Sequence, residues 1–329
     1  MERESLATRT GFDGTIDEYV EVMVGQVREQ VGEAKVLCAL SGGVDSSVCA
    51  AIVHQAVGDQ LICIFVDHGL MRAGEPEGVR ELFGDHFGMK LIMVDAQERF
   101  FAKLAGVEDP EAKRKIIGEE FIRVFEEESR KLGEIDYLVQ GTIYPDILES
   151  DSDSEKGVVK SHHNVGGLPD DFDFELVEPV RYLFKDEVRA AGEALGLSHE
   201  MVWRQPFPGP GLGVRVVGAL TPDTVRMVRE SDAVFRDEIA KAGLAEEIWQ
   251  YFTVCPGGRA VGVVDGARTY GHAIVLRAVN SVDAMHAEVV ELPYDLLKRI
   301  TLRIIDEVEG VTRVMYDTTP KPPGTIEWE

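Results

Sequence analysis

The stretch that decides the fold runs from Lys35 to Ser47 and reads KVLCAL followed by SGGVDSS. The apolar run over 35–40 predicts a strand buried on both faces. Two glycines let the chain turn tightly and approach an anion, and the serines add hydroxyl donors. A helix predicted over 44–55 points its N–H groups and its partial positive charge at the same place. The sequence therefore predicts a phosphate cradle between a strand and a helix.

The cradle differs from a Walker A loop because no Gly-Lys-Ser/Thr closes it. Asp45 would repel a bare phosphate, so its presence implies a bridging cation, for which Mg²⁺ is the natural choice. The alternative is an ordinary glycine-rich turn capped by serine. A chance match to S-G-G-x-D-S is on the order of one in 3,000 for a chain of this length. The pattern therefore favours the cradle.

Outward from the cradle, short apolar strands alternate with amphipathic helices. Further strands are predicted over 61–66, 90–94 and 137–140, and helices over 76–87 and 110–131. Such alternation is typical of a parallel sheet with helices on both faces. Ligands of these sheets bind at the carboxyl ends of the strands, which is where the cradle lies.

The pattern changes after residue 205. A helix predicted over 184–195 is followed by PFPGPGLG at 206–213, which we interpret as an inter-domain hinge free of helix and strand. Beyond it we expect a helix opening at Thr221, strands near 250–254, 260–264, 273–279 and 312–316, and a helix with Leu297, Ile300, Ile304 and Val308 on one face. We therefore predict two domains, residues 1–205 and a small α+β domain at 206–329.

Length and composition limit the class of protein. A chain of 329 residues is long enough for two cores. Its apolar runs are far shorter than the roughly 20 residues of a membrane span, and the N-terminus does not read as a secretion signal. The four cysteines form no CxxC pair, which favours buried free thiols in a reducing compartment. These features predict a cytoplasmic protein without a membrane partner.

The net charge excludes one class of partner. With 34 basic and 59 acidic residues the formal charge is −25, and such a surface repels nucleic-acid phosphate. We therefore expect no nucleic-acid partner. Adaptation to a high-salt cytoplasm and an ordinary acidic protein both fit this charge.

The segment Ser41–Ser47 resembles the pyrophosphate loop of the N-type ATP pyrophosphatases, which include GMP, NAD, asparagine and argininosuccinate synthetases and tRNA-thiolating enzymes. Six further stretches, in order, are similar to GMP synthetase: FVDHGL at 65–70, DPEAKRKIIG at 109–118, QGTIYPD at 140–146, KSHHNVGGL at 160–168, PFPGPGLG at 206–213 and KPPGTIEWE at 321–329. The similarity runs from about residue 17 to the last residue. It implies an α/β fold: a parallel-sheet, adenine-nucleotide alpha-hydrolase-like domain followed by a small α+β dimerisation domain.

The resemblance also implies a reaction. The C2 oxygen of xanthosine monophosphate (XMP) attacks the α-phosphorus of ATP and expels pyrophosphate, and ammonia then displaces AMP to give GMP. Family members often begin with a glutamine amidotransferase domain, whereas the loop here starts at residue 41. The chain thus resembles the separate ATP-pyrophosphatase subunit of the two-subunit archaeal type. We expect a glutamine amidotransferase subunit as its ammonia source, and a homodimer formed through the C-terminal domain.

The same resemblance implies the site residues. Those for ATP and pyrophosphate are Ser41, Gly42, Gly43, Val44, Asp45, Ser46, Ser47, Val66 and His68. Asp45 and Lys185 are the catalytic pair, and Asp45 with Asp146 would hold Mg²⁺. Those for XMP are Arg114, Arg204, Lys321, Ile326 and Glu327.

Several of these residues have a plainer interpretation. Lys185 could be a solvated lysine beside two acidic neighbours, Arg114 part of a solvated helix face, and Lys321 a loose tail residue. His162 and His163 lack the third ligand that zinc needs, so phosphate contact or loop structure is favoured over metal. Many relatives have Asn where His68 stands and His where Gln205 stands, which weakens the inferred nucleotide contacts there.

Three other functions compete with GMP synthesis. NAD synthetase is disfavoured by the C-terminal domain and its TIEWE ending. A tRNA-modifying protein predicts a basic groove and reactive cysteines, which the charge and the apolar surroundings of the cysteines oppose. A non-catalytic scaffold is disfavoured by the intact Asp45 and Lys185.

Overall fold

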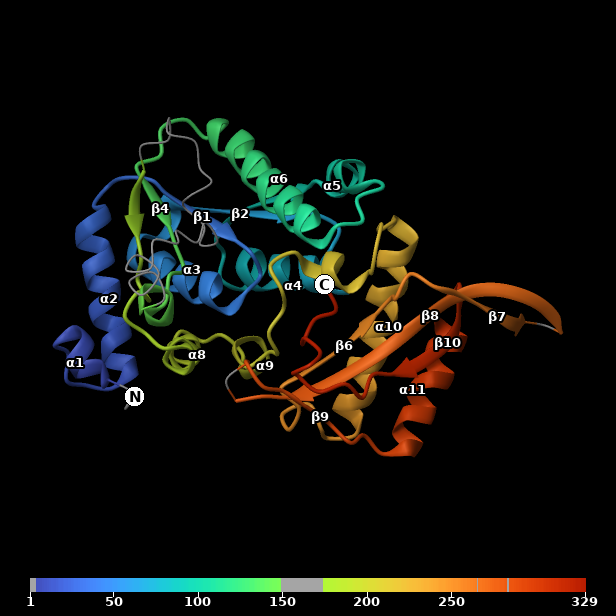
Figure 1. Ribbon diagram of the computed structural model, residues 1–329. Coiled ribbons are helices and arrows are strands. Elements are labelled where there is room, and N and C mark those ends of the chain that lie inside the picture. Colours follow the sequence, from blue (N-terminus) through green and yellow to red (C-terminus); the bar gives the residue numbers. More distant parts are fainter. Residues whose placement is uncertain (1–3, 149–173, 265, 283) are drawn as a thin grey trace. The chain divides into compact units, whose positions relative to one another are not determined.

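The computed structural model describes residues 4–148, 174–264, 266–282 and 284–329 (Figure 1). The chain divides into two compact units. The first comprises Met1–Asp67, Pro76–Asp95 and Phe121–Arg204, and the second comprises His68–Glu75, Ala96–Glu120 and Gln205–Glu329. The last division, after Arg204, lies beside the predicted boundary, but two earlier segments also group with the second unit.

The first unit is built on a five-stranded sheet in the order β3-β2-β1-β4-β5. All four pairings are parallel, as predicted. The strands are β1 (Val36–Leu40), β2 (Leu61–Asp67), β3 (Lys90–Asp95), β4 (Tyr137–Val139) and β5 (Glu175–Val177). Strands β2 and β3 lie on one side of β1, and β4 and β5 lie on its other side. The strand order therefore reverses between β1 and β4.

Helix α3 (Val44–Val57) packs against β1, β2 and β4, and a π-helix over Arg80–His86 packs against β3. The first unit also contains α1 (Leu6–Thr10), α2 (Ile16–Val31), α8 (Lys185–Ala194) and α9 (His199–Val202), whereas the residues of α4 (Glu75–Val79) and α6 (Pro110–Arg130) divide between the units. The sequence pattern did not reveal α2. It opens on a capping box between Thr15 and Glu18 and buries Val20, Val24 and Val27, a spacing that fits one helix face.

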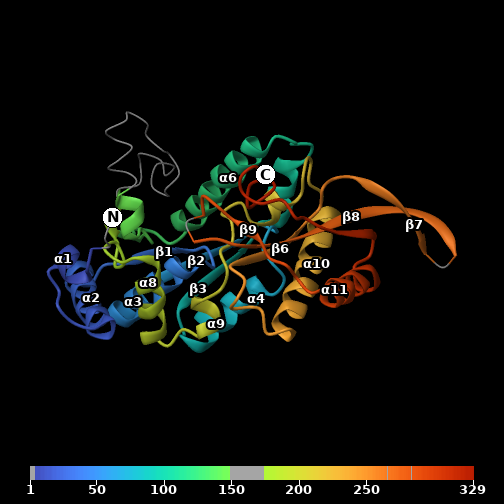
Figure 2. The same ribbon diagram turned by 60° about the horizontal axis from the view of Figure 1, so that its bottom comes forward.

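The second unit has a sheet centred on β8 (Ala267–Asn280), which is longer than predicted. It pairs antiparallel with β6 (Gln250–Val254), β7 (Arg259–Val264) and β9 (Glu288–Val289), and parallel with β10 (Val311–Tyr316). Helices α10 (Pro222–Lys241) and α11 (Tyr294–Glu307) pack against each other and against this sheet, and α5 (Gln97–Leu104) also belongs to the unit (Figure 2). The predicted α+β architecture is confirmed.

The predicted hinge is wrong in its local structure. Gly211–Arg215 forms a 3₁₀-helix, and all five residues are buried. The Leu212 N–H donates to the Leu70 carbonyl at 2.7 Å. Gly211 has φ 62°, and a Cβ there would lie 2.3 Å from that carbonyl oxygen, so only glycine fits. The glycines serve close packing rather than freedom of movement.

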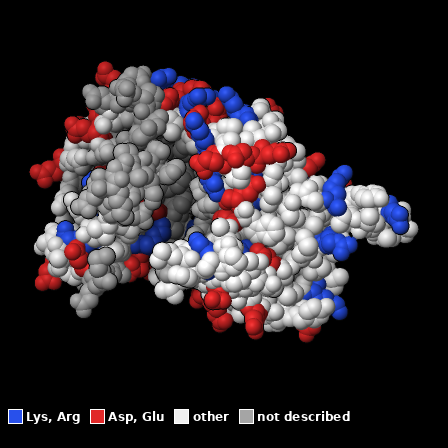
Figure 3. Space-filling model, in the orientation of Figure 1, with Lys and Arg blue, Asp and Glu red and all other residues white. Residues whose placement is uncertain are grey.

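The charged surface and the state of the cysteines agree with what the composition predicts. Acidic side chains are spread over the face drawn in Figure 3, and the β7–β8 hairpin carries the exposed Arg259 and Arg268. All four cysteines lie within the described residues and are buried and free, as predicted. Among the described residues, no helix combines the length and apolar character that a membrane crossing requires.

Candidate nucleotide site

The predicted cradle is a loop between β1 and α3. Gly42 adopts φ 73°, which favours glycine, and Gly43 is the N-cap of α3 and has no side chain to offer the first turn. The hydroxyls of Ser41 and Ser46 lie 3.0 Å apart and join the two ends of the loop. Ser47 donates back to the Gly43 carbonyl at 2.7 Å. The first N–H groups of a 14-residue helix are thus left to an anion.

The neighbouring strand β4 brings Gly141 against this loop. A Cβ at Gly141 would lie 3.3 Å from the Cβ of Asp45 and 3.4 Å from the Ser46 nitrogen. The strand order reverses between β1 and β4, and open α/β sheets bind ligands at that point. The cradle therefore lies at the reversal of strand order.

Lys185 and Asp45 meet at the cradle although 140 residues separate them. The Lys185 ammonium donates to both carboxylate oxygens of Asp45, each at 2.7 Å. The side chains are 43% and 30% exposed, so the pair is open to solvent. Glu187, an acidic neighbour of Lys185 in the sequence, instead forms an ion pair with the buried Arg9 at 2.6 Å.

Arg204 is the second cation at this loop. Its Nη1 donates to the Gly42 carbonyl at 2.8 Å. Arg204 belongs to the first unit, whereas the other four residues predicted for XMP belong to the second. The structure thus brings together Asp45, Lys185 and Arg204 around the loop, with two positive charges and one negative.

Val66 is the last residue but one of β2 and His68 directly follows the strand, and both side chains are buried. The Nδ1 of His68 accepts from the Leu70 N–H at 3.0 Å, and its ring lies against Phe100. Burial, with a smaller effect of Arg229, lowers the pKa of His68 to about 4.

The donors for Mg²⁺ were predicted to be Asp45 and Asp146. Asp146 follows β4, and its carboxylate accepts from the Ile143 N–H at 3.0 Å. No group of three or more His, Cys, Asp or Glu side chains suited to a metal occurs among the described residues. A carboxylate beside serine hydroxyls still suits Mg²⁺, which takes one or two protein carboxylates and completes its shell with phosphate and water. His162 and His163 lie outside the described residues.

Two of the residues predicted to bind XMP form polar contacts with neighbouring residues of the second unit. Arg114 lies on α6, 41% exposed, with Glu111 at 3.4 Å. Lys321 donates from Nζ to the Ala284 carbonyl at 2.8 Å, and its backbone pairs with Ala287, so it is not a loose tail residue.

The C-terminal segment that carries Ile326 and Glu327 is held by two buried arginines that the sequence interpretation missed. Arg277 donates to the carbonyls of Thr319, Thr325 and Ile326 at 2.7–2.9 Å. Arg215 donates to both oxygens of Glu327, at 2.8 and 3.1 Å. The available signal was an arginine inside an apolar run, since a buried cation requires partners.

Lys113 is a third missed residue, next to the predicted Arg114. It is fully buried, and its ammonium donates to the carbonyls of Val216 and Gly218 at 2.8 and 2.9 Å and also pairs with Glu329. In the KRK run of α6, the buried lysine thus holds the last residue while its neighbour faces solvent.

The parallel sheet, the strand–loop–helix cradle and its place at the reversal of strand order resemble a nucleotide-binding domain of the HUP type. The profile of the tRNA methyl transferase HUP domain matches residues 34–77, which include β1, the loop and β2. The profile of the GMP synthase C-terminal domain matches residues 237–328 of the second unit.

Relatives extend this match to nearly the whole chain. The chain is 61% identical to the GMP synthase of Clostridium tetani and 62% identical to that of Symbiobacterium thermophilum, each over 317 residues. Both alignments cover 96% of this chain and 62% of the relative's length. The chain is therefore homologous to the aligned 62% of these GMP synthases. The predicted resemblance is confirmed. Among solved structures, an NH3-dependent NAD synthetase from Campylobacter jejuni is 15% identical with a TM-score of 0.44, over 60% of this chain and 80% of that one.

Proposed function

We propose that this chain carries out the ATP-dependent part of GMP synthesis from XMP. The observation that carries the proposal is the 61% identity to a GMP synthase over 96% of the chain. The C2 oxygen of XMP attacks the α-phosphorus of ATP, the bond to pyrophosphate breaks, and ammonia then displaces AMP at C2. The charge that develops lies on phosphoryl oxygens, so catalysis depends on positioning and electrostatics.

Residues 41–47 hold pyrophosphate at the N-terminus of α3. Asp45 and Asp146 hold Mg²⁺, which neutralises phosphate charge when bound. Lys185 leaves Asp45 for the phosphates, and the solvent-exposed geometry of this pair makes the exchange inexpensive. Arg204 adds a second positive charge beside the loop.

XMP is held chiefly by the second unit. We assign the phosphate to Lys321 and Arg114 and the N–H groups of the purine to the Glu327 carboxylate. Ile326, which packs against Phe252, Val254 and Val275, offers an apolar contact to the base. Arg204, beside the ATP loop, completes the predicted set.

Ammonia comes from a separate glutamine amidotransferase subunit. Glutamine hydrolysis by a cysteine requires a reactive thiolate. All four cysteines of the sequence are buried, and burial raises the pKa of Cys49 and of Cys255. The Sγ of Cys255 lies 3.9 Å from His272 Nδ1, yet the thiol is fully buried. These thiols also suit a cytoplasmic protein.

A homodimer through the second unit completes the proposal. Its β7–β8 hairpin exposes Val261, Val263 and Tyr270, with Val263 71% exposed. Exposed apolar side chains along a strand pair are typical of a protein interface. Light scattering should give the mass of two chains for the wild type and of one chain for Val263→Lys.

The test of the reaction is AMP, pyrophosphate and GMP formation from purified chain with ATP, Mg²⁺ and XMP, at low and at molar salt. We expect GMP with ammonium chloride and none with glutamine. Turnover with glutamine alone would contradict the separate ammonia source. No turnover with XMP, and activity instead with nicotinate adenine dinucleotide or tRNA, would overturn the substrate.

A further inference from the structure

Arg215 is a fully enclosed cation beside Glu327, which we assign to the substrate. It is fully buried, whereas the Glu327 side chain is 19% exposed. Its Nε and Nη2 donate to the two different oxygens of Glu327, at 3.1 and 2.8 Å. This is the two-pronged geometry in which arginine fixes the orientation of a carboxylate.

This geometry leaves Glu327 able to bind something else. A carboxylate has about four lone-pair sites, and Arg215 uses one on each oxygen. Each oxygen therefore retains acceptor capacity on the side away from Arg215. An N–H group of the base can therefore donate to the free side of either oxygen, whose position Arg215 fixes.

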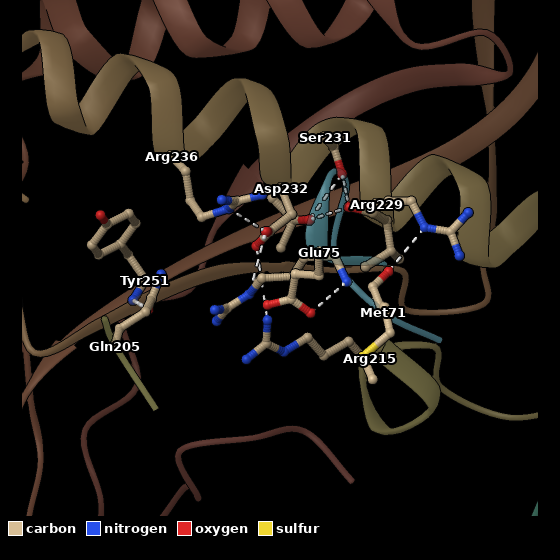
Figure 4. Close-up of polar contacts among 12 residues, drawn as sticks. Met71, Glu75, Gln205, Arg215, Arg229, Ser231, Asp232, Arg236 and Tyr251 are labelled. Atoms are coloured by element: carbon tan, nitrogen blue, oxygen red, sulfur yellow. Dashed lines mark hydrogen bonds and ion pairs between the residues drawn. The ribbon is translucent and has the colours of Figure 1, made fainter. Parts of the chain in front are cut away.

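Arg215 is itself held from behind. Its guanidinium lies over the ring of Phe252, with Cζ 4.1 Å from the ring centroid, and near Phe207 at 5.2 Å. Its Nη1 faces Asp232 Oδ1 at 3.8 Å, and Asp232 is also fully buried. Figure 4 shows Asp232 pointing from α10 toward Arg215, with Arg236 on its other side.

Asp232 is the counter-charge of the cluster. Arg236 donates to its Oδ2 at 2.8 Å, and Arg72 Nε lies 3.8 Å from the same oxygen. Burial lowers the pKa of Arg72 to about 10, and Asp232 opposes this while Arg215 adds to it. Without Asp232, buried guanidinium groups would repel one another, and Arg215 would lose its fixed position.

We propose that Arg215, held by Asp232, is a positioning residue that presents the Glu327 carboxylate to the purine base of the nucleotide substrate. The inference rests on the proposed function, because it takes Glu327 as the acceptor for the base. Arg215 touches neither base nor phosphate. Its effect on the substrate passes through Glu327.

The test is a double-mutant cycle on the full chain, with the KM for XMP and the KM for ATP measured from pyrophosphate release at saturating ammonium. The variants are Arg215→Lys, which keeps the charge and loses the fork, Glu327→Gln, and the pair together. Arg303→Lys, an arginine in the same unit that pairs with Asp237, Glu238 and Glu307, is the matched control. Thermal unfolding of each variant reports on the fold.

We expect each single variant to raise the KM for XMP about tenfold and to leave the KM for ATP within about twofold. The double variant should be no worse than Glu327→Gln, because the two residues act in series. Arg303→Lys should match the wild type. The proposal would be overturned if a folded Arg215→Lys had an unchanged KM for XMP, or if its KM for ATP rose as much as its KM for XMP. It would also be overturned if the effects of the two single variants on the KM for XMP multiplied in the double variant.

Asp232→Asn provides the second variant, since it keeps the shape of the side chain, removes its negative charge and leaves Arg215 itself unsubstituted. It should raise the KM for XMP by less than Arg215→Lys does, and an unchanged value would contradict the role of Asp232. Failure of the proposed function looks different, because the wild type would then release no pyrophosphate with XMP and ATP.

Discussion

The two units hold their charged site residues in opposite ways. In the first, Lys185 and Asp45 form an ion pair that solvent reaches from both partners. In the second, Arg215 and Arg277 are buried, and the carboxylates to which they donate, Glu327 and Asp317, lie near the end of the chain. A solvent-exposed pair contributes little to stability and can be exchanged for a ligand, whereas removal of one partner from a buried pair leaves a charge without solvation. The first arrangement suits groups that must move to phosphate, and the second suits groups that must not move.

The largest effect should come from Arg277→Met, which tests the buried side of this comparison. The change removes the donor of three backbone carbonyls and the cationic partner of Asp317, which retains the neutral donors of Thr319 and Trp328. We expect the free energy of unfolding to fall by roughly 3–5 kcal/mol. Urea unfolding of the full chain measures it, with Arg303→Met as the matched control on a more exposed network. Equal losses in the two variants would contradict the distinction.

Lys185→Met tests the exposed side. Because the pair is open to solvent, stability should change by less than about 1 kcal/mol. The rate of pyrophosphate release should fall about 10²–10³-fold, as when one preorganised charge is removed from a transition state. Lys131→Met, which breaks an exposed pair with Glu128 on α6, is the control for both measurements. A stable variant with the wild-type rate would remove Lys185 from the mechanism.

His68 gives the buried region a pH dependence. Its folded pKa of about 4 lies below the ordinary 6.5, so the unfolded chain binds a proton that the folded protein excludes. Stability should therefore decrease as the pH falls from about 6.5 to about 4, by up to roughly 3 kcal/mol. Urea unfolding at several pH values across this range should show that the free energy of unfolding changes less steeply with pH in His68→Asn than in the wild type. Parallel slopes in the two proteins would argue against a buried neutral imidazole.

The difference between the units also determined what could be predicted from the sequence. The cradle is contiguous, so glycines, serines and Asp45 in one stretch reveal both the turn and its chemistry. The meeting of Lys185 with Asp45 depends on how α8 packs near α3, which no local pattern encodes. The partners of Arg215 lie in α10 and at the C-terminus, and an arginine among apolar residues shows only that partners must exist. The 3₁₀-helix at Gly211–Arg215 was missed because close contact with Leu70, rather than propensity, selects its glycines.

The smallest effect on stability should come from Arg114→Ala, where the two interpretations of one residue separate. Arg114 and Glu111 are 41% and 73% exposed, and such a pair is worth under about 0.5 kcal/mol to the fold. If Arg114 binds the nucleotide, as we propose, the KM for XMP should rise about tenfold while stability stays within that limit. Lys115→Ala, which removes the next exposed cation of α6 and its pair with Glu119, is the control. An unchanged KM in both variants would return Arg114 to the solvated face of α6, and the positive charge for the XMP phosphate would then come from Lys321. A rise in both would point to the summed charge of α6 rather than to one contact, and higher salt should then abolish it.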